Sequence, residues 1–281
     1  MNCSQVLAAL AAVLLASTLG ACTSPGSPGT RPASPPEKAR APASAPEAAI
    51  KDIYADPDAY LRDHFDPAQL PARALVPAGS SAEPPVPPRF RKARVTYRVA
   101  YDDAEHTPEV VAVIDYRGLA GGYVASRSEY ARNAVPYRTN FLLTFGGVFV
   151  LKSQTVFLER PNAEPSSMVR STYRMDRGVA APVSGGEYWF EASGADAPQA
   201  AGPAPWRTDC KAGEKVPAST IHPALSGDAV AIDCAFSGSN QVVQRHEKSY
   251  MLLDYGFALQ REYADSRRKA TFKIQDLGIE R

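Results

Sequence analysis

The chain has 281 residues, of which 44% are hydrophobic, and a formal net charge of +1 at neutral pH. This length is sufficient to bury a sizeable core in one large domain or in two small ones. The near-zero charge supplies no overall attraction to nucleic acid or to an anionic membrane surface, so no nucleic-acid partner is expected.

Residues 1–21 have the form of an export signal. The apolar run from Val6 to Leu19 would make about 21 Å of helix, which is too short for a comfortable membrane span but typical of a signal peptide. Leu19-Gly20-Ala21-Cys22 follows directly. This tetrapeptide resembles the lipobox of substrates of the bacterial lipoprotein signal peptidase.

The lipobox resemblance implies cleavage before Cys22, lipidation of its thiol and attachment to a membrane through the acyl chains. In the sorting pattern of such lipoproteins, Asp after the modified cysteine retains a protein at the inner membrane. Thr23 occupies that position here, which implies the inner leaflet of an outer membrane, facing the periplasm. The segment from Met1 to Gln5 departs from the usual signal pattern, because it contains no Lys or Arg. The alternative is a plain secretory signal that ends by chance at a cysteine.

Residues 22–49 are predicted to form a tether, starting at the lipidated cysteine. The segment is rich in Pro, Ala and Ser. It cannot bury enough apolar surface to offset the entropy of ordering it.

A short helix and a Pro-rich irregular segment are expected within residues 50–88. Asp56 is a plausible N-cap, since Pro57 would then occupy the first helical position. Tyr60, Leu61 and Phe65 would share one face of that helix.

Residues 89–281 are predicted to form a mainly β domain. Val95, Tyr97, Val99 and Tyr101 alternate with more polar residues, which is the period of a half-buried strand. Further strands are expected at 109–116, 123–130, 141–145, 148–158, 168–175, 187–192, 229–236, 250–255, 257–263 and 270–276, with turns at Arg117-Gly118 and Gly146-Gly147. Their spacing favours an antiparallel sandwich, an open barrel or a large curved sheet.

Two of the four cysteines, Cys210 and Cys234, remain after removal of the signal and lipidation of Cys22. In an oxidising compartment this pair predicts a structural disulfide, with Cα atoms about 4.4 to 6.8 Å apart. We expect the bond to staple an irregular loop onto a core strand. A redox pair or half of a metal site is the alternative, although the chain has no C-x-x-C motif.

Motifs of known chemistry are scarce. The sequence contains no G-x-S-x-G, no H-E-x-x-H and no calcium-loop spacing. Its histidines, His64, His106, His222 and His246, are scattered singly. The acidic turn at 102–106 would be either a charged hairpin tip or a weak site for a hard cation. No catalytic, cofactor-binding or metal-binding residue is predicted, and no cofactor.

Residues 215–227 form a Pro-containing loop without strand alternation. Together with Leu252-Leu253-Asp254-Tyr255-Gly256, this loop resembles part of a C-terminal module of uncharacterised secreted proteobacterial proteins, over about residues 205 to 276. The resemblance implies no known activity. The loop is either a recognition surface or a packed connection.

The leading functional hypothesis is a membrane-tethered lipoprotein with a non-enzymatic binding or structural role. It would act as a carrier with a lipid-sized cavity, or as a module that binds an envelope protein or neutralises a toxin. An apolar cavity above about 300 Å³ would favour the carrier, and a closed core with an exposed patch the protein binder. The rival class is an envelope hydrolase with a dispersed Ser/His/acid site, which would show a cleft joining those groups. The many aromatic residues of the strands would form either core or cavity lining.

Overall fold

The computed structural model describes residues 50–70, 72–75, 88–102, 109–158, 166–175, 184–197 and 204–281. The signal segment, Cys22 and the tether lie outside these ranges. Residues 41–281 belong to one compact unit. Within the described ranges, no helix combines the length and apolar character needed to cross a membrane.

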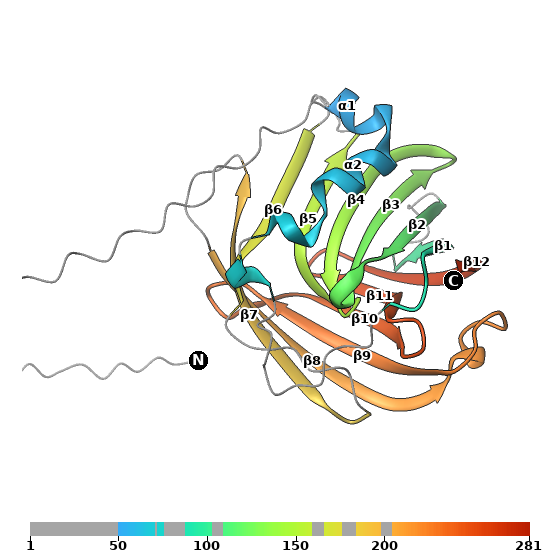
Figure 1. Cartoon of the computed structure of the whole chain (residues 1–281). Coiled ribbons are helices and arrows are strands. Elements are labelled where there is room, and N and C mark those ends of the chain that lie inside the picture. Colours follow the sequence, from blue (N-terminus) through green and yellow to red (C-terminus); the bar gives the residue numbers. More distant parts are fainter. Residues whose placement is uncertain are drawn as a thin grey trace, which may run out of the picture. The chain divides into compact units, whose positions relative to one another are not determined.

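Twelve antiparallel strands within the described ranges form a closed barrel, in which each strand pairs with its neighbours in sequence and β1 pairs with β12 (Figure 1). The strands are β1 (Lys92–Tyr101), β2 (Val110–Gly118), β3 (Tyr123–Arg132), β4 (Val135–Phe145), β5 (Phe149–Phe157), β6 (Ser166–Met175), β7 (Glu187–Ala197), β8 (Ala204–Pro217), β9 (Asp228–Ser237), β10 (Val243–Leu252), β11 (Phe257–Asp265) and β12 (Lys269–Glu280). This confirms the mainly β, antiparallel prediction. Of the three expected forms the open barrel is the nearest, but the barrel is closed.

The barrel closes in two different ways along its length. β11 and β12 share a ladder only from Glu262–Ala264 to Lys269–Thr271. Beyond it, β12 pairs with β1 alone and β11 with β10 alone. Phe257 of β11 packs in this part against Tyr116 of β2 and against Phe90, with ring centres 4.8 and 4.7 Å apart. Hydrogen bonds therefore join β11 to β12 near one end only, and aromatic contacts hold the start of β11.

Alternation along β1 shows how the sequence builds this wall. Val95, Tyr97 and Val99 are buried, whereas Arg94 and Arg98 between them are exposed. The buried set packs with residues of β2, β11 and β12 in one hydrophobic cluster. The predicted strand and its two faces are confirmed.

Before the barrel, the described residues form two helices and two 3-10 turns: α1 (Ile50–Ala55), α2 (Pro57–His64), η1 (Pro67–Gln69) and η2 (Ala72–Ala74). The predicted cap is confirmed, because the Asp56 carboxylate accepts a hydrogen bond from the Ala59 N–H (2.8 Å) and Pro57 begins α2. Leu61 and Phe65 are buried, and the Phe65 ring lies 5.8 Å from that of Phe141 on β4.

The helices lie on the outside of the barrel, against the strands β3 to β5 (Figure 1). The Tyr54 hydroxyl donates to Thr139 Oγ1 (2.6 Å), and the Tyr60 hydroxyl donates to Gln154 Oε1 (2.7 Å). Thr139 and Gln154 are almost fully buried. Polar side chains on the outer face of β4 and β5 are thus satisfied by the helices.

Of the two predicted turns, one is confirmed and one is wrong. Gly146 and Gly147 join β4 to β5 with φ of 59° and 71°, the left-handed region that favours glycine. Gly118, however, is the last residue of β2. A Cβ on Gly118 would lie 2.3 Å from the Phe90 carbonyl oxygen, so this glycine is required by a close backbone approach and not by a turn.

The expectation of an irregular loop around Cys210 is also wrong. Cys210 lies within β8, a strand of 14 residues. Thr208, Cys210 and Ala212 are buried, but they are small or polar. Because small and polar side chains give little hydrophobic alternation, the period of this strand is hard to recognise in the sequence.

Candidate functional site

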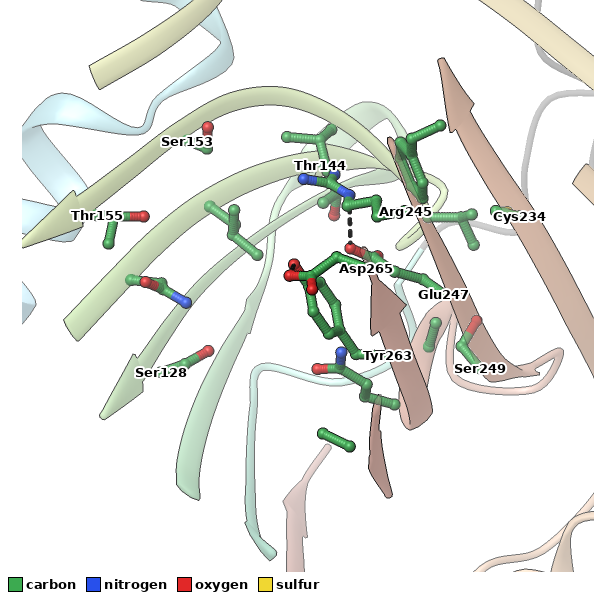
Figure 2. Close-up of a pocket in the computed structure, with 18 of the residues that line it drawn as sticks. Ser128, Thr144, Ser153, Thr155, Cys234, Arg245, Glu247, Ser249, Tyr263 and Asp265 are labelled. Atoms are coloured by element: carbon green, nitrogen blue, oxygen red, sulfur yellow. Dashed lines mark hydrogen bonds and ion pairs between the residues drawn. The ribbon is translucent and has the colours of Figure 1, made fainter. Parts of the chain in front are cut away.

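The interior of the barrel holds a cavity of about 870 Å³. Its walls come from the inner faces of β3, β4 and β5 on one side and of β9, β10 and β11 on the other (Figure 2). Cavities that bind small molecules in proteins measure about 300 to 1,000 Å³. The size expected for a carrier is therefore present.

One wall of this cavity carries a polar band, consisting of Ser126, Ser128, Asn140, Ser153 and Thr155. The register places Ser128 opposite Asn140 and Asn140 opposite Thr155, so these three side chains form one row across β3, β4 and β5. Figure 2 shows Ser128, Ser153 and Thr155 around the cavity. The cavity is thus not the apolar one that sequence reasoning required for a lipid carrier.

Several groups of the polar band have no protein partner in the described part of the chain. Ser126 and Ser128 are only 5% and 3% exposed, yet neither side chain has a hydrogen bond there. The Asn140 Oδ1 atom is buried and has no partner either. For Asn140, whose oxygen is fully buried, the missing partner costs about 1 to 3 kcal/mol. An apolar side chain would avoid that cost if the wall were only structural.

One end of the cavity lies where β11 and β12 are joined, because residues 265–268 of that hairpin line it. Four arginines line it, here called the arginine mouth: Arg138, Arg245, Arg267 and Arg268. Only Arg245 forms an ion pair among the described residues, with Nε 3.0 Å from Glu247 Oε1 (Figure 2). The other three guanidinium groups have no carboxylate partner there.

The second carboxylate at the mouth, Asp265, is already occupied. The Tyr263 hydroxyl donates to its Oδ2 (2.7 Å), and the backbone N–H groups of Arg267 and Arg268 donate to its Oδ1 (2.8 and 3.1 Å). These bonds, with that of Tyr263 the strongest, hold the pKa of Asp265 below its ordinary value. Burial and the adjacent carboxylate raise the pKa of Tyr263 to about 12. At neutral pH, Asp265 is therefore ionised and Tyr263 is protonated.

Arg138 is held in place by aromatic rings. Its guanidinium lies 3.9 Å from the centre of the Tyr130 ring, which is a cation–π geometry. Its Nε is buried and has no hydrogen-bond partner. Burial raises the pKa of Tyr130, against the opposing effect of the Arg138 charge. The result is a fixed positive charge beside a neutral phenol at the entrance of the cavity.

The opposite end of the barrel is covered by the loop between β8 and β9. Ala218 and Leu225 of this loop are buried in the core. The Ser226 N–H donates to the Tyr255 hydroxyl oxygen (3.3 Å). Of the two expectations for residues 215–227, these contacts support the packed connection.

The predicted disulfide between Cys210 and Cys234 is present, and Cys234 lines the cavity. The two residues stand directly opposite each other on β8 and β9. Their Cα atoms are 4.1 Å apart, which is shorter than expected. Directly opposed residues of an antiparallel pair approach this closely where they do not exchange backbone hydrogen bonds.

The described histidines lie away from the cavity. His64 stacks on Tyr60 on the outside of the barrel, with 4.3 Å between ring centres. His222 accepts a hydrogen bond from the Ala224 N–H (3.3 Å), and His246 is exposed on β10. His106 and most of the acidic turn lie outside the described residues. In the described ranges, no three His, Cys, Asp or Glu side chains gather into a possible metal site.

A second hollow, of about 530 Å³, lies outside the barrel between α2 and the strands β1, β2 and β12. At its edge, Asp115 pairs with Arg94 (2.6 Å) and Arg127 (2.8 Å), and Arg127 also pairs with Asp58 (3.0 Å). Burial alone would raise the pKa of Asp115, but the two arginines outweigh it and lower this pKa. Because these charges satisfy one another, this hollow offers less to a ligand than the barrel interior.

No protein-family model and no curated protein sequence matches this chain. Among solved structures, it is similar to a crystal structure described as a β-barrel-like protein of domain of unknown function DUF1849 from Brucella abortus. The two chains are 10% identical, with a TM-score of 0.34, and the match covers 69% of this chain and all of the other. A likeness of this extent says nothing about the ligand or the activity.

Sequence reasoning did not identify the polar band or the arginine mouth. A signal for the band was present in the segment from Tyr123 to Tyr130. Ser126 and Ser128 occupy one face of that strand, while Arg127 and Glu129 occupy the other. A strand that is polar on both faces, inside a domain with a large core, indicates a wall facing a cavity or water.

Proposed function

We propose that this chain is a membrane-tethered periplasmic lipoprotein that binds a small ligand in the interior of its barrel. The observation that carries the proposal is the 870 Å³ cavity whose wall contains buried polar groups without protein partners. The lipobox sequence at Cys22 supports the tether and the periplasmic location. The proposed role is binding, not chemistry.

The competing hypotheses draw less support from the described residues. A carrier of a wholly apolar lipid would leave the polar band unpaired against an alkyl chain. A protein-binding surface would favour an extended apolar patch. The large hydrophobic side chains exposed in the described part are Val135, Val242 and Val243, which lie at hairpins or their edges. For a hydrolase, none of the three described histidines reaches the cavity.

Native mass spectrometry of the full-length protein, purified from envelopes in mild detergent, tests the binding proposal. We expect a non-covalent adduct on the wild-type protein. Leu142 points into the cavity from β4, on the same face as Asn140, so Leu142→Trp should place an indole ring beside the polar band and displace the adduct. Val113 lies on β2 and does not line the cavity, so Val113→Trp is the matched control and should retain it.

Circular dichroism and thermal melting must first show that both variants keep the β fold. If the wild-type protein carries no adduct, or if the adduct survives Leu142→Trp, the cavity is not the binding site and the proposal is wrong.

A further inference from the structure

The polar band and the arginine mouth are complementary to different chemical groups of a ligand. Side chains of the polar band carry hydroxyl or amide groups, which both donate and accept hydrogen bonds. Three of them form a single row across adjacent strands, Ser128–Asn140–Thr155. A ligand that satisfies such a row needs several donors and acceptors on one face, as the hydroxyl groups of a saccharide provide.

The positive charge of the arginine mouth favours binding of an anionic group. Arg138, Arg267 and Arg268 have no carboxylate partner in the described part of the chain. Asp265 and Glu247 supply two negative charges at this end against four arginines, so an excess of positive charge remains there. Guanidinium groups bind carboxylates and phosphates through paired, charge-assisted hydrogen bonds.

The two features are close enough to serve one molecule. Arg138 and Asn140 are two residues apart on the inner face of β4 and both line the cavity. Residues at this spacing on one face of a strand are about 7 Å apart. One ligand the size of a sugar acid can therefore contact both residues.

We infer that the ligand of this cavity is an acidic saccharide, with its acidic group at Arg138 and its hydroxyl groups on the polar band. The inference rests on the proposed binding function and narrows it to one ligand class. A fatty acid would satisfy the mouth but not the band. A neutral sugar would satisfy the band but not the mouth.

Isothermal titration calorimetry on the full-length protein, in detergent, tests the inference with four probes. Digalacturonate is the acidic saccharide, maltose a neutral disaccharide of similar size, laurate an apolar acid and tri-aspartate an acidic peptide. We expect digalacturonate to bind about ten- to hundredfold more tightly than each of the other three. Trp206 lines the cavity, so its fluorescence should change on binding.

Single substitutions test the arginine mouth and the polar band separately. Arg138→Gln should weaken digalacturonate binding about ten- to hundredfold and leave that of maltose almost unchanged. Arg98→Gln is its matched control, because Arg98 is exposed on the outer face of β1 at the same end of the barrel and does not line the cavity. Thr155→Val should weaken both saccharides about two- to tenfold. Thr271→Val, on the outer face of β12, should weaken neither.

Each of the following results would overturn the inference. Equal binding of digalacturonate and maltose would remove the acid requirement, and so would an unchanged affinity in Arg138→Gln. Equal or tighter binding of laurate or tri-aspartate would show a different ligand class while the binding function stands. If no probe binds, although the adduct on the wild-type protein is lost in Leu142→Trp, the inference fails and the proposed function is retained.

Discussion

Removal of the disulfide between Cys210 and Cys234 should lower stability by an amount that the structure allows us to estimate. The bond joins residues 24 positions apart. The chain-entropy model for a closed loop of about 25 residues gives about 3.5 kcal/mol from restriction of the unfolded chain. For a domain of about 200 residues, this corresponds to a fall of roughly 7 to 14 °C in the melting temperature.

The double variant Cys210→Ala/Cys234→Ala is the appropriate perturbation. Both cysteines are 4% exposed, so serine would bury two hydroxyl groups and add a cost of its own. The β8–β9 ladder continues on both sides of the bond, and so we expect the native fold to survive without it. Urea unfolding should then show a lower midpoint and a steeper slope, because the uncrosslinked chain exposes more surface when it unfolds.

Two outcomes would refute this reasoning. Two free thiols in the wild-type protein, measured under denaturing conditions, would show that the bond does not form. Full stability of the double variant, together with loss of ligand binding, would favour the redox pair over the structural disulfide. Wild-type protein treated with a reducing agent serves as the control and should match the double variant.

Three further predictions concern the anchor, the tether and the charge network. Cys22→Ser should release the protein from membranes or leave an unprocessed precursor, and unchanged membrane fractionation would contradict the lipobox assignment. Limited proteolysis should cut between about residues 23 and 46 and leave a resistant β core, whereas protection from several proteases would show that this segment packs. Asp115→Asn should lower the free energy of unfolding by about 1 to 3 kcal/mol at neutral pH, because Arg94 and Arg127 lose their shared carboxylate. The native pKa of Asp115 lies below its ordinary value of 3.8, so its contribution is complete above about pH 4 and disappears as the pH falls through the lowered pKa. A difference between variant and wild type that does not shrink in acid would contradict this account.

Local patterns in the sequence determined several elements of the fold correctly. Alternation at Val95 to Tyr101 predicted a two-faced strand, and the Asp56-Pro57 pair predicted the start of α2. Gly146-Gly147 predicted a tight hairpin, and the disulfide followed from the number of exported thiols. Each of these features depends on neighbouring residues or on a simple count, so no knowledge of the barrel was needed.

Other local features depended on distant parts of the chain. Only glycine fits at position 118, because the Phe90 carbonyl leaves no room for a Cβ atom. This carbonyl belongs to a segment nearly thirty residues earlier in the chain. β8 is held by its partners β7 and β9, although its own side chains show weak hydrophobic alternation. In both cases the tertiary partner, and not the local sequence, decides the conformation.

The cavity was decided by the tertiary structure alone. Arg138 and Arg268 are 130 residues apart in the chain, and both line the mouth only because the pairing of β1 with β12 closes the sheet into a barrel. Ser128, Asn140 and Thr155 form a row only because the register of β3, β4 and β5 aligns them. A shift of one residue in that register would turn each side chain to the opposite face of the sheet. The sequence by itself determined that strands would form, whereas register and closure determined which side chains share the cavity, because both depend on pairing between strands across the whole barrel.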